Sequence, residues 1–216
     1  MADGPERART LDLAASVRAA LERHPNVLGV ELVGSRAEGT PVPLSDWDFV
    51  VRADDVDAVA RDLPALVAEL DPIAGQWDRL GPPEYSCYML FLEGPVKVDL
   101  IVDTPHELEP PWRVEAETLE GIDRHFWDWT LWLASKRQRG QDDLVREQLE
   151  AMSAHLLRPL GVTEVPRSIG DAIAAYRAAR DLREAELGVA VPRRLEREVL
   201  RVVPPDRRPA RPGLGS

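Results

Sequence analysis

Two carboxylates stand at the start of a predicted strand, in a spacing that suits metal-assisted phosphate chemistry. Asp46 and Asp48 are two residues apart at the entry to an apolar run over residues 47–52. Because alternate side chains of a strand point to the same face, both carboxylates should lie side by side. Like charges repel in a half-buried site, and a divalent cation removes that cost. The pair therefore predicts a magnesium site at the mouth of this strand.

A Gly-Ser pair precedes these acids and ends another predicted strand. Residues 28–33 alternate between apolar and other side chains, which is the pattern of a strand, and Gly34 and Ser35 stop it. Glycine allows the backbone to approach a phosphate closely, and serine adds a hydroxyl donor. Metal-binding acids that face such a phosphate cradle are the groups that phosphoryl or nucleotidyl transfer requires.

The segment from Gly34 to Asp48 resembles the signature of the polymerase-β-type nucleotidyltransferase superfamily. Gly34-Ser35, ten residues and then Asp46-Trp47-Asp48 match the pattern GS-x10-DxD, and apolar strands bracket both pieces. The context GSRAEGTPVPLSDWDFVV looks most like the small bacterial branch that includes aminoglycoside and lincosamide nucleotidyltransferases. An ordinary turn followed by an exposed acid pair is the alternative, and it does not explain the flanking strands.

This superfamily uses a third carboxylate on a later strand, and Asp99 matches that role. In the strand over residues 96–102, Asp99 shares one face with Lys97 and Ile101, while the other face is apolar. An acid inside an apolar strand is costly to bury without a cation or hydrogen bonds. Asp103, at the end of the strand, competes for the role but is expected to cap a turn.

The resemblance implies a role for each of these residues. Asp46, Asp48 and Asp99 would bind magnesium, with two ions expected. Asp99 would also help to deprotonate the acceptor hydroxyl, through the metal or directly as a base. Gly34 and Ser35 would bind the β- and γ-phosphates of ATP, the expected co-substrate.

Two basic residues are further candidates for contact with nucleotide phosphates. Arg36 follows the Gly-Ser pair, where a solvated arginine is an equal alternative. Lys136 is preferred because similar proteins often carry a basic residue on the corresponding helix. Four aromatic residues precede Lys136 on that helix, and core packing is favoured for them over a substrate or base-stacking pocket. They are Phe126, Trp127, Trp129 and Trp132.

The first half of the chain is predicted to be a mixed α/β unit. Residues 1–8 should be loose, Thr10 should cap a helix over residues 11–23, and Asp54 or Asp55 should open a second helix that reaches about residue 70. Strands are expected over residues 28–33, 47–52, 73–80, 85–92 and 96–102. The resulting order α-β-β-α-β-β-β predicts an α/β (α+β) nucleotidyltransferase core with a mixed sheet of about five strands.

A proline-rich stretch over residues 104–112 has no periodicity and marks a domain boundary. Residues 1–108 are expected to form the catalytic domain and residues 109–203 an all-α C-terminal domain, followed by a disordered tail over residues 204–216. The helices of the second domain are predicted over residues 123–139, 142–157, 168–187 and 192–203.

Composition and charge exclude several classes of function. The net charge of −11 comes from residues 1–110, which argues against binding to a nucleic-acid backbone and would attract a polycationic small molecule, although acidity can equally serve solubility. With Cys87 as the single cysteine and no apolar run of membrane-spanning length, we expect a cytoplasmic protein without membrane contact. Loops typical of P-loop ATPases, dinucleotide-binding dehydrogenases and α/β-hydrolases are missing from the sequence.

These features predict a magnesium-dependent nucleotidyltransferase that moves AMP from ATP to a hydroxyl of a small molecule and releases pyrophosphate. By the resemblance, the acceptor would be an aminoglycoside or a lincosamide. Two alternatives stay open: an antitoxin-like nucleotidyltransferase that modifies a protein, and a nucleotide-binding module without turnover. The predicted helical domain favours a small-molecule acceptor, and the intact signature argues against a decayed site. A homodimer is compatible with the resemblance, although nothing in the sequence demands one.

Overall fold

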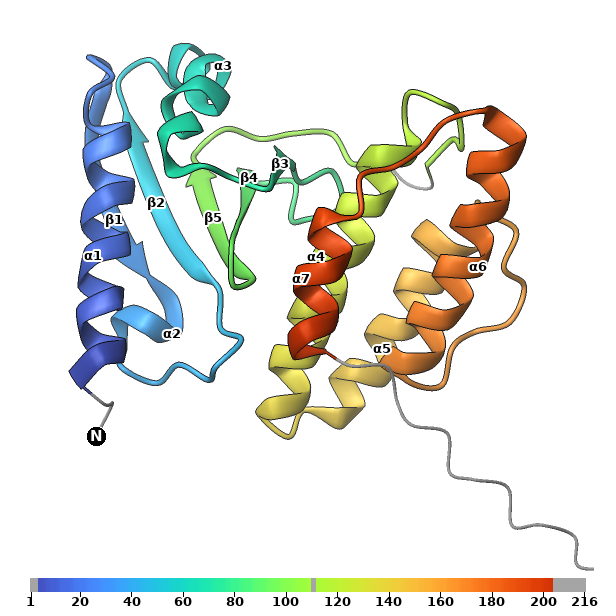
Figure 1. The fold of residues 1–216 in the computed structure, drawn as a ribbon. Helices are drawn as coiled ribbons and strands as arrows, with labels where there is room; N and C mark the ends of the chain where they lie inside the picture. The colour runs from blue at the N-terminus through green and yellow to red at the C-terminus, as the bar shows by residue number, and fades with distance from the viewer. Residues whose placement is uncertain (1–3, 110–111, 204–216) are drawn as a thin grey trace, which may run out of the picture.

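A five-stranded mixed sheet organises the first half of the chain (Figure 1). The computed structural model describes residues 4–109 and 112–203, with only the backbone described for residues 4–11. The spatial order of the strands is β1-β2-β5-β4-β3; β2 and β5 are parallel, and the other neighbours are antiparallel. The strands are β1 (Val27–Val33), β2 (Trp47–Ala53), β3 (Ala74–Trp77), β4 (Ser86–Leu92) and β5 (Val96–Val102). The predicted mixed sheet is therefore confirmed.

Helices α1 (Gly4–Leu21) and α3 (Val56–Leu66) cover one face of this sheet. The predicted start of the first helix is wrong, because α1 begins at Gly4, so that residues 4–8 are helical and Thr10 lies inside the helix. Pro5 is tolerated in a first turn, and the Glu, Arg and Ala residues after it favour a helix. Residues 1–3 lie outside the described part of the chain.

Asp55 caps α3 as one of the two predicted alternatives, since its carboxylate accepts a hydrogen bond of 2.9 Å from the Ala58 N–H. Pro64 lies within α3, two residues before its end, and it cannot donate the regular helix hydrogen bond to the Ala60 carbonyl oxygen. A short 3₁₀ turn, η1 (Ala68–Leu70), then completes the predicted segment.

The opposite face of the sheet packs against the C-terminal helices. Cys87, Met89 and Phe91 of β4 belong to the same hydrophobic cluster as these helices, and Figure 1 shows the helices gathered beside the sheet. The predicted helical C-terminal region is thus confirmed, whereas its status as a separate domain stays a prediction. The helices are α4 (Leu119–Gln138), α5 (Asp142–Met152) with a π turn η2 (Ser153–Leu157), α6 (Ile169–Leu187) and α7 (Arg194–Val202).

Two predicted boundaries are corrected by local hydrogen bonds and packing. Strand β3 ends at Trp77 rather than at residue 80, because the Asp78 carboxylate accepts from the N–H groups of Leu80 and Gly81, at 2.9 and 3.0 Å, and turns the chain. Helix α4 begins at Leu119, four residues before the predicted start, and Leu119 is fully buried. The predicted disordered tail lies outside the described residues. Within the described residues, no helix combines the length and apolarity needed to span a membrane.

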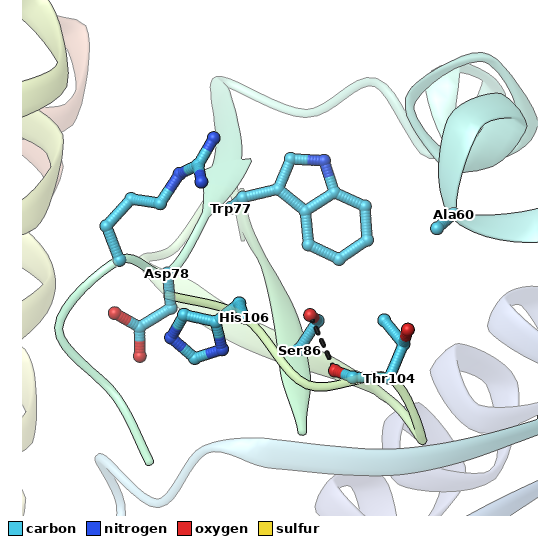
Figure 2. Close-up of a pocket in the computed structure, with 7 residues that line it drawn as sticks. Ala60, Trp77, Asp78, Ser86, Thr104 and His106 are labelled. Atoms are coloured by element: carbon cyan, nitrogen blue, oxygen red, sulfur yellow. Dashed lines mark hydrogen bonds between the residues drawn. The ribbon is translucent and has the colours of Figure 1, made fainter. Parts of the chain in front are cut away.

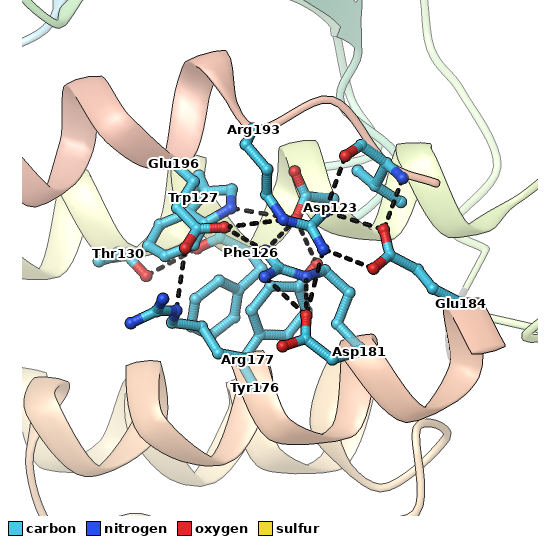
Figure 3. Close-up of polar contacts among 12 residues, drawn as sticks. Asp123, Phe126, Trp127, Thr130, Tyr176, Arg177, Asp181, Glu184, Arg193 and Glu196 are labelled. Carbon is cyan, nitrogen blue, oxygen red and sulfur yellow. Dashed lines mark hydrogen bonds and ion pairs between the residues drawn. The ribbon is translucent and has the colours of Figure 1, made fainter. Parts of the chain in front are cut away.

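A buried ion cluster joins α4, α6 and α7 (Figure 3). Arg180 on α6 is 1% exposed and pairs with Asp123 on α4, at 3.3 Å, and with Glu196 on α7. Burial raises the pKa of Asp123, while a hydrogen bond of 2.6 Å from the Tyr176 hydroxyl and the charge of Arg180 favour its ionised form. These bonds fix α4 against the other helices, and α4 carries several residues of the site described next.

Candidate active site

The Gly-Ser pair closes against the second acid of the signature. Gly34 ends β1 as predicted and begins a single helical turn, α2 (Gly34–Ala37), with a φ angle of +67°. A Cβ atom on Gly34 would lie 2.6 Å from Oδ2 of Asp48, since Val33 pairs with Asp48 across β1 and β2. Glycine is therefore required here by both the backbone angle and the space that the Asp48 carboxylate occupies.

The sheet brings the three predicted acids together. Asp48 on β2 is paired in register with Asp99 on the parallel strand β5, and Asp46 precedes β2 by one residue. One oxygen from each of the three carboxylates lies within 4.8 Å of the others. Oδ1 of Asp46 and Oδ1 of Asp99 are buried without a hydrogen-bond partner among the described residues. Because buried acceptors are normally satisfied, these oxygens fit a hard divalent cation such as Mg²⁺.

A lysine and a fourth acid complete the cluster, and sequence reasoning assigned no role to either. Lys97 is only 8% exposed, and its Nζ lies 2.9 Å from Asp99 Oδ2, 2.8 Å from Asp128 Oδ1 and 3.7 Å from Asp46 Oδ2. Asp128 comes from α4, far along the chain from the signature. The sequence could have indicated this position, because Asp128 precedes Trp132 by four residues and Lys136 by eight, and residues at this spacing share one helix face.

The cluster keeps an ammonium group among carboxylates. Burial disfavours the charged form of Lys97, but Asp128, Asp46 and Asp99 together raise its pKa well above the usual value. Burial raises the pKa of Asp99 to about 8 and that of Asp128 to about 6, and in both cases Lys97 opposes the increase. The protein therefore holds more buried carboxylates here than Lys97 alone can balance.

The charge around Asp48 shows which other cations reach the site. Burial and the neighbouring Asp46 raise the pKa of Asp48, while Lys97, Lys136 and Arg36 act in the opposite direction. Lys136 lies on the last turn of α4, with its Nζ 4.7 Å from the centroid of the Trp132 ring. The predicted phosphate contact of Lys136 stays a prediction.

Arg36 fastens the loop that carries the first acid. Its Nε donates to the carbonyl oxygens of Ser45 and Asp46, both at 3.1 Å, and its Nη2 donates to Ser45 at 2.7 Å. The guanidinium also lies 4.3 Å from the centroid of the Trp47 ring. These bonds give Arg36 a positioning task beside Asp46, and its contact with a triphosphate stays a prediction.

The end of α4 is tied to the same loop. Arg139 Nη2 donates to the Ser45 hydroxyl at 2.9 Å, and Gln138 Oε1 accepts from the Leu44 N–H at 3.3 Å. Ser45 in turn accepts a hydrogen bond from the Val42 N–H. The helix that supplies Asp128 and Lys136 is therefore fixed directly to the loop that supplies Asp46.

A cavity of about 500 Å³ opens beside α4, next to the acidic cluster. Tyr85, Trp129 and Trp132 contribute aromatic walls, and Asp78 and Asp128 contribute carboxylates. The prediction of core packing for the aromatic residues of α4 is confirmed for the fully buried Phe126 and Trp127. Trp129 and Trp132 are only partly buried against the core, and they also line the cavity. Because Asp128 also contacts Lys97, this cavity is connected to the three acids of the signature.

A smaller cavity of about 210 Å³ lies near the end of β3 (Figure 2). Trp77, Ser86 and His106 are among its lining residues, and the Ser86 hydroxyl donates to the carbonyl oxygen of Thr104 at 2.8 Å. None of the acids of the signature lines it, so we assign it no part in the chemistry.

Comparisons with known proteins were made for both sequence and structure. Neither a scan against protein-family models nor a search of curated proteins found a match. Among solved structures, the chain is similar to a cytoplasmic RNA terminal U-transferase, with 18% identity over 47% of this chain and 30% of that one and a TM-score of 0.39. It is also similar to an aminoglycoside 6-adenyltransferase from Bacillus subtilis, with 14% identity over 87% of this chain and 93% of that one and a TM-score of 0.30.

These distant similarities do not assign the chain to a family. The chain spans only 30% of the length of the U-transferase, and both similarities are too distant to carry an argument about activity or substrate. Any function assigned to this chain therefore depends on the geometry of its own residues.

Proposed function

We propose that this protein is a nucleotidyltransferase that depends on a divalent cation and transfers a nucleoside monophosphate, AMP from ATP in the first instance, to a hydroxyl of a small cationic acceptor. Pyrophosphate is the second product. One observation carries the proposal: Asp46, Asp48 and Asp99 converge within 4.8 Å at the Gly34 turn, and two of their buried oxygens have no partner among the described residues. Three carboxylates beside a glycine turn suit a metal-bound triphosphate.

Each residue of the site has a task in this proposal. Magnesium held by the three acids would neutralise the triphosphate and stabilise the charge that develops on the departing pyrophosphate. Gly34 and Ser35 would contact the phosphates, and Lys136 would add positive charge on the side of Asp48. Asp99, as one of the metal ligands, would also help to deprotonate the acceptor hydroxyl, through the metal or directly as a base.

The acceptor class is inferred from the cavity beside α4. Its aromatic walls, Trp129, Trp132 and Tyr85, can pack against a sugar ring or an ammonium group, and the carboxylates of Asp78 and Asp128 favour positive charge. The negative charge of the first half of the chain acts in the same direction. An acceptor rich in both amino and hydroxyl groups, such as an aminoglycoside, fits these features best.

The test is the release of pyrophosphate from MgATP in the presence of a panel of aminoglycosides and lincosamides. We expect the wild type to release pyrophosphate only with a particular acceptor, and Asp48→Asn to lower the rate by roughly 10³-fold or more, since a bound metal supplies several kcal/mol of charge stabilisation. Asp103→Asn is the matched control, because it removes an exposed acid at the end of the neighbouring strand and should change the rate by less than about twofold.

The other outcomes are equally informative. An Asp48→Asn variant with the rate of the wild type would contradict the proposed mechanism. Magnesium-dependent binding of ATP without release on any small acceptor would favour the alternative of a protein acceptor. Absence of ATP binding would exclude the transfer of AMP to either kind of acceptor.

A further inference from the structure

The acidic cluster has an ammonium group built into it. Lys97 follows the alternation of β5, which places it two residues before Asp99 on the same face, and the packing of α4 places Asp128 against it. The cluster holds four carboxylates, from Asp46, Asp48, Asp99 and Asp128, around this one buried ammonium. Buried carboxylates that lacked a counter-cation at neutral pH would strongly destabilise the fold.

The distances show how the carboxylate oxygens are divided. Nζ of Lys97 lies 2.9 Å from Oδ2 of Asp99 and 3.7 Å from Oδ2 of Asp46. The Oδ1 atoms of the same two residues are the buried oxygens without a partner among the described residues. Lys97 therefore engages one oxygen of each carboxylate and leaves the other in a position to bind a cation.

We propose that Lys97 is an internal counter-cation that holds Asp99 and Asp46 in place, so that the site is formed and the protein is folded before a divalent ion binds. Lys97 is a positioning residue in this role, and the inference rests on the metal site of the proposed function. Asp128 anchors the ammonium from the side of α4, at 2.8 Å, and thereby links the acceptor cavity to the metal ligands.

The other cations near the cluster are engaged in different ways. Arg36 donates to backbone carbonyl oxygens of the loop before β2, and Lys136 lies over the ring of Trp132. Lys97 forms ion pairs with Asp46, Asp99 and Asp128 at once. Removal of its charge should therefore make the fold depend on a divalent ion.

The experiment compares thermal unfolding of the full chain in EDTA and in Mg²⁺. Lys97→Met keeps the length of the side chain and removes the charge. We expect its Tm to fall by roughly 6–20 °C in EDTA, as for a broken buried ion pair, and to recover by more than about half in Mg²⁺. The wild type should be much less sensitive to the ion. A lysine that served only for packing would lose the same stability in both buffers.

Two further variants keep the test decisive even if Lys97→Met cannot be purified. Arg52→Met is the control, since it removes one positive charge from an exposed position near the end of β2 and breaks none of the ion pairs of Lys97, and its response to Mg²⁺ should equal that of the wild type. Asp128→Asn removes one negative charge from around Lys97, so its Tm should rise less with Mg²⁺ than that of the wild type.

Binding of Mn²⁺ to the wild type, measured by electron paramagnetic resonance, tests the metal site of the proposed function separately from the role of Lys97. If the wild type binds no Mn²⁺, the metal site of the proposed function fails, and the role of Lys97 fails with it. If the wild type binds Mn²⁺ but Lys97→Met loses equal stability in both buffers, or Asp128→Asn responds more strongly to Mg²⁺ than the wild type, only the role of Lys97 is overturned.

Discussion

Replacement of Gly34 by alanine should disable the site while leaving the fold in place. A Cβ atom at this position would lie 2.6 Å from Oδ2 of Asp48. Because an ordinary C···O contact is about 3.4 Å, the carboxylate oxygen would have to move by about 0.8 Å. A catalytic group displaced by about 1 Å can cost roughly 10²-fold in rate, so we expect a loss of this order in pyrophosphate release.

Gly39→Ala provides a matched control within the same loop. Gly39 has a φ angle of +74°, close to the +67° of Gly34, but a Cβ atom there would meet nothing within 4 Å. Both substitutions should cost roughly 1–2 kcal/mol from the left-handed backbone, which corresponds to a decrease in Tm of about 2–8 °C. Only Gly34→Ala should displace Asp48.

Two assays distinguish the variants. Titration with Mn²⁺ should show binding weakened by roughly 10-fold or more in Gly34→Ala and nearly unchanged in Gly39→Ala, and pyrophosphate release should follow the same order. If the two variants lose equal stability and keep equal metal affinity and rate, contact between Gly34 and Asp48 has no part in the function, and the reasoning from this distance is refuted.

Two further predictions concern stability. Burial lowers the pKa of His125 to about 4, and the charges of Lys97 and Arg79 act in the same direction while Asp78 opposes them. Between pH 6.5 and 4 the unfolded chain therefore binds a proton at His125 that the folded protein does not bind. Up to about 3 kcal/mol of the free energy of unfolding should be lost as the pH falls through this range. Urea unfolding of His125→Phe should lack this part of the pH dependence, and an unchanged acid sensitivity would contradict it. Arg180→Met should cost about 3–5 kcal/mol in the same assay, because it leaves Asp123 buried without its cation, whereas Arg177→Met, at a half-exposed partner of Glu196, should cost less than about 1 kcal/mol. Equal losses would show that burial of the Arg180–Asp123 pair is unimportant.

Local pattern was sufficient for most of the fold. Apolar alternation predicted the strands around Asp48 and Asp99, and helical periodicity predicted the C-terminal helices. The ends of elements were less predictable, since they depend on interactions outside the pattern. The Asp78 side chain shortens β3, and helix-favouring residues before Thr10 extend α1.

The spacing of the signature predicted which acids would meet, because residues two apart on a strand share a face whatever surrounds them. The sequence also indicated that Asp99 lies opposite the apolar face of its strand, and the parallel pairing of β2 with β5 then brought it beside Asp48. The approach of Asp48 to Gly34 depends on that same sheet. It shows that glycine is required at this position for lack of space as well as for the backbone angle of the turn.

Tertiary structure alone decided what surrounds these acids. Asp128 and Arg139 lie more than eighty residues from Asp46, and only the packing of α4, fixed by Arg180 and its partners, places them beside the cluster and its loop. Side-chain pattern reports which face of an element is apolar, but it does not report which distant element covers that face. The cation in the cluster, the cavity for an acceptor and the attachment of α4 to the signature loop therefore became visible only in the folded protein.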